Sequence, residues 1–196
     1  MEPDHDDQDE RASDAQLTRS ATRPEAFTPL VEKYSPALHG YFARRVPGAA
    51  DDLLAEAWLQ AFAARRTFDA ARGSARGWLF GVARNVLAGH ARRAGREAGA
   101  PAPAANDPWQ AVDQRLDAAA LAPELRRALD GLPPEERELM LLVSWEQLTP
   151  TEAAAAVGIP AGTARSRLHR ARGRLRERLA PARPALRNLT MTGDPA

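Results

Sequence analysis

The chain has 196 residues and no cysteine, and 44% of its residues are hydrophobic. This length fits one large domain or two small ones with a buried core, and the lack of thiols excludes disulfides, thiolate metal sites and cysteine nucleophiles. No apolar run approaches the roughly 20 residues of a membrane span, and the acidic N-terminus lacks the basic and apolar layout of a signal peptide. A cytoplasmic protein without a membrane-inserted segment is therefore predicted.

The formal net charge of +1 hides an uneven distribution of charge. Seven acidic residues and one arginine lie in the first 18 positions, whereas six arginines and no acid lie between Arg72 and Arg96. Nine arginines and one acid lie between Arg165 and Arg187. A GC-rich genome would explain arginine in place of lysine, but not the missing acids. Two separate basic blocks predict a polyanion that is contacted at two places.

Helical periodicity and its interruptions divide the chain into five parts. Residues 1–22 are acidic and aperiodic, and disorder is predicted for them. Residues 23–94 read as a helical domain, 95–114 as a linker rich in Ala and Pro, and 115–180 as a second helical domain. Residues 181–196 are expected to fray. No stretch has the period of a strand, so the predicted fold class is all-α, with two small helical domains on a flexible linker.

Three helices are predicted in the first domain. Apolar residues within 27–42 share one helical face, and Pro29 and Pro36 should break or kink that helix. The second helix, residues 51–65, has an apolar face that should point inward. Its inward residues are Leu54, Trp58, Ala61 and Phe62.

Charged and polar residues are expected on the outer sides of these helices. Asp52 and Glu56 lie one turn apart on the second helix, opposite its apolar face. A loop of arginines and small residues, 66–76, leads into a third helix with an apolar stripe from Trp78 onward. The polar residues outside that stripe are Arg84, Asn85, Arg92 and Arg93.

The second domain carries sharper helix signals. Pro133 and Pro134, followed by two glutamates, mark a helix start. A capping box with proline at the first helical position spans residues 149–152 and starts a short helix that ends at Gly158. A further helix begins near Ala161. A short helix, a tight turn and a second helix form the spacing of a helix-turn-helix.

The last predicted helix has two different faces. Alanines and leucines at a 3-4 spacing can pack inward, and a basic face lies opposite them. About 19 residues, or roughly 28 Å, is long enough to cross a DNA major groove. Arg165 and Arg170 can bond guanine, while Ser166 and His169 can donate to bases or phosphates. A solvated surface helix is the alternative, but the basic face favours DNA binding.

Four segments resemble extracytoplasmic-function sigma factors of the sigma-70 superfamily. Residues 162–172, GTARSRLHRAR, resemble the recognition-helix pattern of that family. The segment LDGLPPEERELMLL resembles the start of its promoter-binding domain, 50–56 its polymerase-binding helix and 77–85 its strand-opening helix. The resemblance spans residues 25–180, and four motifs in the family order are far more specific than any one of them.

The resemblance implies partners and site residues in the first domain. It implies that the second helix docks on core RNA polymerase, through Asp52, Leu53, Glu56 and Gln60. It also implies that the loop Thr67–Ser74 and the helix after it capture a flipped base of the downstream promoter element, because an extruded base needs polar contacts and phosphate charge. The residues implied in that contact are Thr67, Arg72, Arg76, Arg84, Asn85, Arg92 and Arg93.

In the second domain the resemblance implies contacts to the upstream promoter element. The residues are Thr163, Arg165, Ser166, Arg167, His169, Arg170 and Arg172. His169 stands where the family varies, so no promoter sequence is inferred.

Several residues keep a second interpretation. A solvated acidic face is the alternative for Asp52 and Glu56, and a basic helix end stabilised by the macrodipole is the alternative for Arg92 and Arg93. Gly89 stands where the family usually carries aspartate, which puts the helix length there in question. Trp109, in the linker, would contact either the other domain or the polymerase.

The sequence therefore predicts a sigma factor that binds core RNA polymerase and promoter DNA and assists promoter melting. An anti-sigma protein is a further candidate partner. The alternative function is a stand-alone helix-turn-helix regulator. No catalytic constellation, metal site or cofactor is predicted, because the four histidines are scattered and no phosphate loop or catalytic triad is present.

Overall fold

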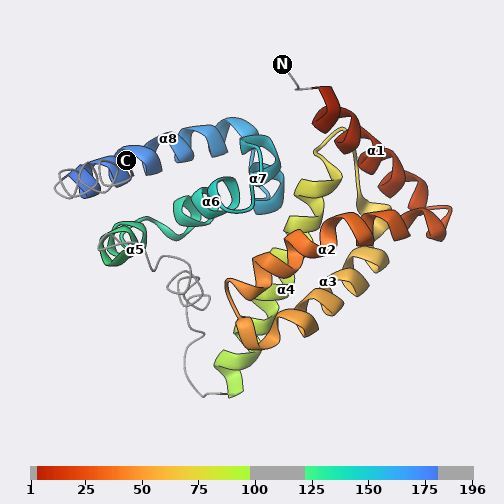
Figure 1. Cartoon of the computed structure of the whole chain (residues 1–196), viewed down its shortest axis with the longest axis horizontal. Coiled ribbons are helices and arrows are strands. Elements are labelled where there is room, and N and C mark those ends of the chain that lie inside the picture. The colour runs from red at the N-terminus through yellow and green to blue at the C-terminus, as the bar shows by residue number, and fades with distance from the viewer. Residues whose placement is uncertain (1–3, 98–121, 181–196) are drawn as a thin grey trace, which may run out of the picture.

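The computed structural model describes residues 4–97 and 122–180, and all regular structure in these two ranges is helical. The first range forms an N-terminal bundle of α1 (Asp4–Ser20), α2 (Thr28–Ala43), α3 (Ala50–Ala64) and α4 (Ala75–Glu97). The second forms a C-terminal bundle of α5 (Ala122–Asp130), α6 (Pro134–Ser144), α7 (Pro150–Val157) and α8 (Ala161–Leu179) (Figure 1). The all-α fold class is confirmed. None of the described helices has the length and apolar character needed to cross a membrane.

Several predicted segments lie wholly or partly outside the described residues, among them residues 1–3 of the N-terminal part and 115–121 of the second domain. The fraying tail 181–196 and Trp109 fall outside them altogether. Of the predicted linker, residues 95–97 belong to α4, and the remainder is outside. Helix α4 also continues through Gly89, so that glycine does not end it.

Helix α1 shows that the prediction of disorder is wrong for residues 4–20. The side chain of Leu17 is 0% exposed, and Ser13 and Ser20 are buried as well. The Asp14 carboxylate accepts a hydrogen bond at 2.5 Å from the backbone N–H of Ala75, the first residue of α4. The acidic composition concealed this helix because its ordering depends on packing against the rest of the bundle, which sequence periodicity does not report.

Helix α2 runs from Thr28 to Ala43 through Pro36, so the predicted break does not occur. An internal proline costs a helix about 3 kcal/mol. The opposing gain is the burial of a large apolar face, at about 1.5–3 kcal/mol for each large side chain. That face comprises Leu30, Tyr34, Leu38, Tyr41 and Phe42.

The buried face of α3 is rotated from the predicted one. Its buried residues are Ala50, Leu53, Ala57 and Ala61. Trp58 is half-buried, and Phe62 is 38% exposed. Both rings instead pack edge-on against Phe27, at centroid distances of 5.7 and 5.3 Å. Small alanines on the inner side let α3 lie close to α2 and α4, and the bulkier rings take the edge.

The C-terminal bundle confirms the local predictions. The Thr149 hydroxyl accepts a hydrogen bond at 3.2 Å from the Glu152 N–H, and the Glu152 carboxylate accepts one at 2.8 Å from the Thr149 N–H. Gly158 ends α7 with a left-handed φ of 79°. The inward residues of α8 are Ala164, Leu168, Ala171 and Leu175.

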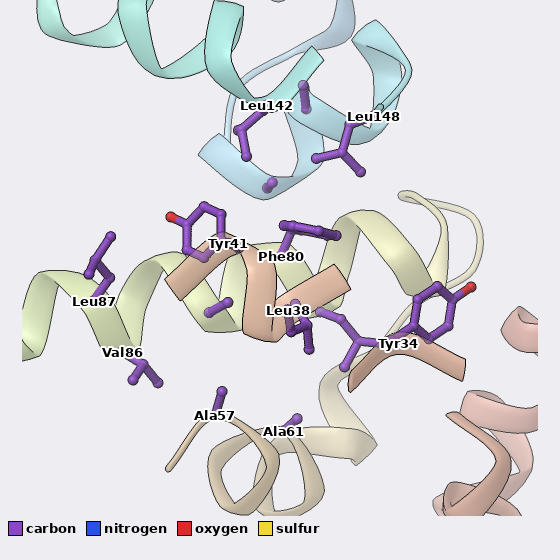
Figure 2. Packing of buried hydrophobic residues seen from close by; sticks show 14 of the residues in the cluster. Tyr34, Leu38, Tyr41, Ala57, Ala61, Phe80, Val86, Leu87, Leu142 and Leu148 are labelled. Atoms are coloured by element: carbon purple, nitrogen blue, oxygen red, sulfur yellow. The ribbon is translucent and has the colours of Figure 1, made fainter. Parts of the chain in front are cut away.

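The two bundles pack against each other through α4 and α7. One apolar cluster includes residues from both bundles. In Figure 2, Leu142 and Leu148 of the C-terminal bundle face Tyr41 and Phe80 of the N-terminal bundle. The sequence predicts two domains on a flexible linker but not which of their helices meet, because no local pattern encodes a contact between distant helices.

If α1 belongs to the N-terminal bundle, Leu17→Ala should destabilise it by about 2–5 kcal/mol, the usual cost of truncating a buried leucine. Urea unfolding of the full chain, followed by circular dichroism, measures this change. Thr18→Ala, at the neighbouring exposed position, is the matched control and should change stability by no more than about 0.5 kcal/mol. Equal effects of the two substitutions would show that α1 does not pack as described.

Candidate docking and nucleic-acid interfaces

The outer side of α3 is an acidic face with an apolar centre. Asp52 and Gln60 are exposed, Glu56 is half-buried, and the Gln60 amide donates a hydrogen bond at 2.9 Å to the Glu56 carboxylate. Leu59 lies on the same side and is 73% exposed. A large exposed leucine among acids is an arrangement suited to a protein partner with a basic surface.

Leu53 does not belong to this face. Its side chain is 2% exposed and lies in the hydrophobic core, so the prediction that it contacts a partner is wrong. Leu59 was missed, although the spacing of Asp52, Glu56 and Leu59 places them on one helical stripe. That spacing was the signal that could have identified it.

Two predicted interfaces are linked by an ion pair. The Arg93 guanidinium on α4 lies 3.0 Å from the Glu56 carboxylate on α3, and both side chains are partly exposed. Such a pair contributes at most about 1 kcal/mol. Its main consequence is for the charge of the two surfaces. Glu56, the predicted polymerase contact, and Arg93, the predicted DNA contact, partly neutralise each other.

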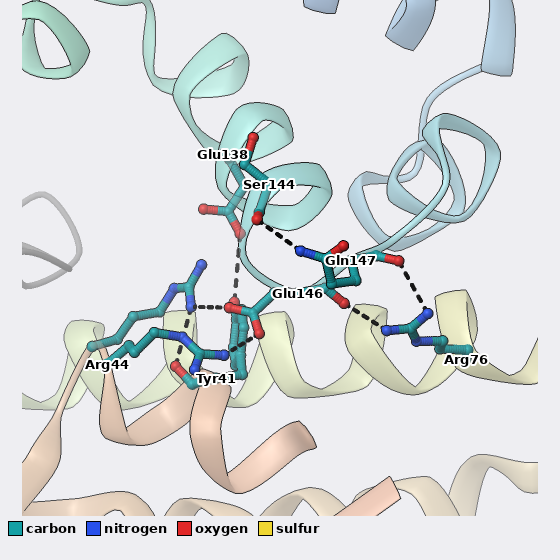
Figure 3. A network of polar contacts seen from close by, with 8 residues as sticks. Tyr41, Arg44, Arg76, Glu138, Ser144, Glu146 and Gln147 are labelled. Atoms are coloured by element: carbon teal, nitrogen blue, oxygen red, sulfur yellow. Dashed lines mark hydrogen bonds and ion pairs between the residues drawn. The ribbon is translucent and has the colours of Figure 1, made fainter. Parts of the chain in front are cut away.

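The other residues predicted to contact the downstream promoter element differ in their exposure to solvent. Thr67, Arg72, Asn85 and Arg92 are exposed, and Arg84 is half-buried. Arg76 is already engaged, because its guanidinium donates to two backbone carbonyls of the turn between α6 and α7. The distances are 2.6 Å to the Glu146 oxygen and 3.1 Å to the Gln147 oxygen (Figure 3).

The loop before α4 borders a groove of about 780 Å³ between the two bundles. Thr67, Arg72 and Trp78 line it from the N-terminal bundle, and Thr151 and Pro160 line it from the C-terminal bundle. The predicted base-capturing loop therefore faces the start of α7 and the turn into α8.

Helix α8 presents a polar face to solvent. Arg165, Ser166, His169 and Arg172 are exposed, while Thr163 is half-buried. The Ser166 hydroxyl donates to the Thr163 carbonyl at 2.9 Å. Four adjacent exposed side chains, two of them cationic, can contact base edges or phosphates along a groove.

Several arginines of α8 are instead held within the bundle. Arg167 pairs with Glu135, and Arg174 pairs with Glu136. The Arg170 guanidinium lies 3.6 Å from the same Glu136 carboxylate. These carboxylates fix the guanidinium groups and compete with any DNA contact.

Arg178 is held in a similar way, since it donates to the Ala128 carbonyl at 2.9 Å and so joins α8 to α5. The basic block thus offers fewer free cations than its sequence contains.

No metal site is apparent in the described ranges, where no three His, Asp or Glu residues gather closely enough to hold an ion. The geometry offers an acidic surface on α3 and a basic surface on α8 as candidate binding surfaces, together with the loop before α4 and the exposed side of α4.

Each of the two bundles matches a known family model. Residues 30–97 match the model described as sigma-70 region 2, and residues 123–175 match the model described as sigma-70, region 4. The chain is 37% identical over 148 residues to the ECF RNA polymerase sigma factor SigF of Caulobacter vibrioides, covering 74% of this chain and 80% of that protein.

A second relative is longer. The ECF RNA polymerase sigma factor SigE of Mycolicibacterium smegmatis is 35% identical over 135 residues, which are 67% of this chain and 52% of that protein. This chain therefore matches about half the length of that relative.

Among solved structures, the sigma factor RpoE in complex with the anti-sigma factor NepR from Bartonella quintana is similar, with a TM-score of 0.53 and 26% identity. The match covers 79% of this chain and 96% of that chain. Together with the two family regions and the relatives, it leads to one assignment: the chain belongs to the extracytoplasmic-function RNA polymerase sigma factors of the sigma-70 family.

Proposed function

We infer that this protein binds core RNA polymerase, directs it to specific promoters and assists promoter melting. The observation that carries this inference is the presence of a region 2 match and a region 4 match on one chain, the first over the acidic α3 and the second over the basic α8. A stand-alone helix-turn-helix regulator is not favoured, because it would have no use for region 2. The protein itself performs no covalent chemistry, and the location of polymerase and chromosome places it in the cytoplasm.

We further assign the polymerase contact to Asp52, Glu56, Leu59 and Gln60 on α3. An apolar anchor surrounded by charged groups is the usual composition of an interface hot spot, and acidic side chains speed the encounter with a basic partner.

The DNA contacts are assigned to two surfaces. Asn85 and the exposed arginines of α4 and its loop contact the downstream element, and the exposed face of α8 contacts the upstream element. An anti-sigma protein is a further proposed partner, since the structural relative RpoE is described in complex with one.

The docking assignment predicts that combining Asp52→Lys with Leu59→Ala weakens core polymerase binding at least tenfold, or about 1.4 kcal/mol. Both side chains are exposed, so the fold should survive. Co-elution of the full chain with core enzyme on size exclusion, with titration by fluorescence anisotropy, measures the change. Glu25→Lys, an exposed charge reversal elsewhere in the bundle, is the control. Wild-type protein that fails to co-elute would count against the proposed function itself.

The strand-opening assignment predicts a selective defect for Asn85→Ala. A flipped base is engaged only after its pair has separated, so open-complex formation should fall at least tenfold while the initial closed complex forms normally. Permanganate reactivity of promoter thymines, measured beside a gel-shift assay of closed complexes, separates the two steps. Normal thymine reactivity in the variant would remove Asn85 from the base contact.

The upstream assignment distinguishes base contacts from phosphate contacts. Arg165→Ala should cost about 1–3 kcal/mol and relax the preference at one base pair, whereas Arg176→Ala, nearer the C-terminal end of α8, should weaken binding to all sequences alike and lower the salt dependence by about one phosphate contact. Holoenzyme binding to promoter variants across a salt series measures both effects. A uniform loss for Arg165→Ala would reduce its role to electrostatic attraction.

A further inference from the structure

We propose that Glu136 is a positioning residue that sets the promoter selectivity of α8. Its single carboxylate holds the Arg170 guanidinium in place for a base contact and withdraws Arg174 from the DNA phosphates. The proposal rests on the function inferred above and deepens it. It names a residue outside the DNA-binding surface that controls how well this surface discriminates between sequences.

The arginines of α8 form two rows with different surroundings, because residues three, four or seven positions apart lie on one side of a helix. The first row is exposed and makes no ion pair within residues 4–97 and 122–180. It consists of Arg165, Arg172 and Arg176. The second row is paired with carboxylates at the start of α6. It consists of Arg167, Arg170 and Arg174. The positive charge that α8 offers to DNA is therefore concentrated on one side of the helix.

Glu136 owes its place to the start of α6, which packs alongside α8 (Figure 1). Helix α6 begins at Pro134, so Glu136 lies in its first turn, where the helix macrodipole favours a negative charge. The Glu136 side chain is 7% exposed, whereas those of Arg170 and Arg174 are 56% and 42% exposed. The anion is therefore fixed inside the bundle, while its two cations reach the surface.

The two oxygens of the Glu136 carboxylate act on different arginines. Oε2 accepts a hydrogen bond from Nη1 of Arg174, and Oε1 lies 3.6 Å from Nε of Arg170. Nη1 and Nη2 of Arg170 make no hydrogen bond in the described part of the chain. An arginine can bind O6 and N7 of guanine through two such nitrogens. A guanidinium that is held at Nε loses less freedom when its two terminal nitrogens bind a base.

The neighbouring glutamate provides a contrast. Glu135 pairs with Arg167, but the Glu135 side chain is 62% exposed. Water and salt screen a pair of this kind, so its arginine can exchange readily onto a phosphate. A carboxylate removed from water interacts more strongly with its cations. Of these two glutamates, only Glu136 therefore imposes a restraint that DNA must overcome.

A purely structural role is the competing interpretation, since Glu136 also joins α6 to α8. The two interpretations predict opposite changes in non-specific binding. Loss of a structural contact would loosen α8 and weaken binding to every DNA. Loss of a restraint would free Arg174, and an additional free cation strengthens binding to DNA of any sequence.

Glu136→Gln tests the proposal, because it keeps the size of the side chain and removes its charge. Holoenzyme made with the full chain is offered two duplexes in competition across a salt series, one with a matched and one with a scrambled upstream element. Affinity for the scrambled duplex should rise about threefold, and its salt dependence should increase by about one phosphate contact. The preference for the matched duplex should fall about fivefold. An equal loss of affinity for both duplexes would show a structural role and overturn the proposal.

Two further variants separate the freed cation from a general change of charge. Glu135→Gln makes the same change of net charge one residue away and should change either affinity by less than about twofold. Adding Arg174→Gln to Glu136→Gln should return the affinity for the scrambled duplex to within about twofold of the parent, because the two residues act as a pair. Circular dichroism confirms that each variant is folded. An equal effect of Glu135→Gln, or no reversal by Arg174→Gln, would overturn the proposal.

Binding to heparin, a polyanion without bases, tests the restraint apart from the polymerase. The full chain with Glu136→Gln should elute from a heparin column at a higher salt concentration than the chain with Glu135→Gln, although the two have the same net charge. Elution at the same concentration would contradict the proposal. If the parent holoenzyme does not distinguish the matched from the scrambled duplex, the proposed function fails, whereas the heparin measurement still reports whether Glu136 withdraws Arg174.

Discussion

The packing of α4 is the constraint on which the rest of the structure depends. This helix contacts α1, α2 and α3 within its own bundle and α7 of the other bundle. Its buried residues, from Ala75 to Leu87, therefore face several partners rather than one. A helix packed in this way leaves only a narrow side exposed, and the proposed DNA contacts Asn85 and Arg92 lie there.

Intramolecular pairing decides how much of the basic sequence is available to DNA. Each guanidinium that is bonded to a carboxylate or carbonyl of the same protein must exchange that bond before it can hold a phosphate. Arg76, Arg93 and Arg174 are in this position. Arg72, Arg92 and Arg165 are exposed, and among residues 4–97 and 122–180 none of the three has such a bond. A count of arginines in the sequence therefore overstates the number of phosphate contacts, and with it the salt dependence of binding.

The interface between the bundles combines apolar packing, close approach of two helices and a buried ion pair. Gly77 and Gly81 set the distance between α4 and α7, and the pair of Arg45 with Glu146 sets the register. A buried ion pair adds little net stability over the hydrated ions, but it penalises any arrangement that leaves one charge unpaired. Such a contact therefore selects one arrangement of the two bundles over others that would bury Arg45 or Glu146 without its partner.

Much of this protein follows from sequence alone. The helices of the C-terminal bundle could be predicted from the sequence because their signals are local. These signals are a capping box at Thr149, a left-handed Gly158 and a 3-4 apolar spacing, and each involves only residues close together in the chain. The family motifs likewise located α3, α4 and α8, since the chemistry of each site is concentrated in a short segment. Three features were decided only by the tertiary structure. They are the folding of residues 4–20 as helix α1, the rotation of α3 that buries Leu53 and exposes Leu59, and the contact of α7 with α4. Each of these depends on which distant surfaces meet, and the free energy of that choice comes from burial and pairing between segments far apart in the chain, which no local pattern contains.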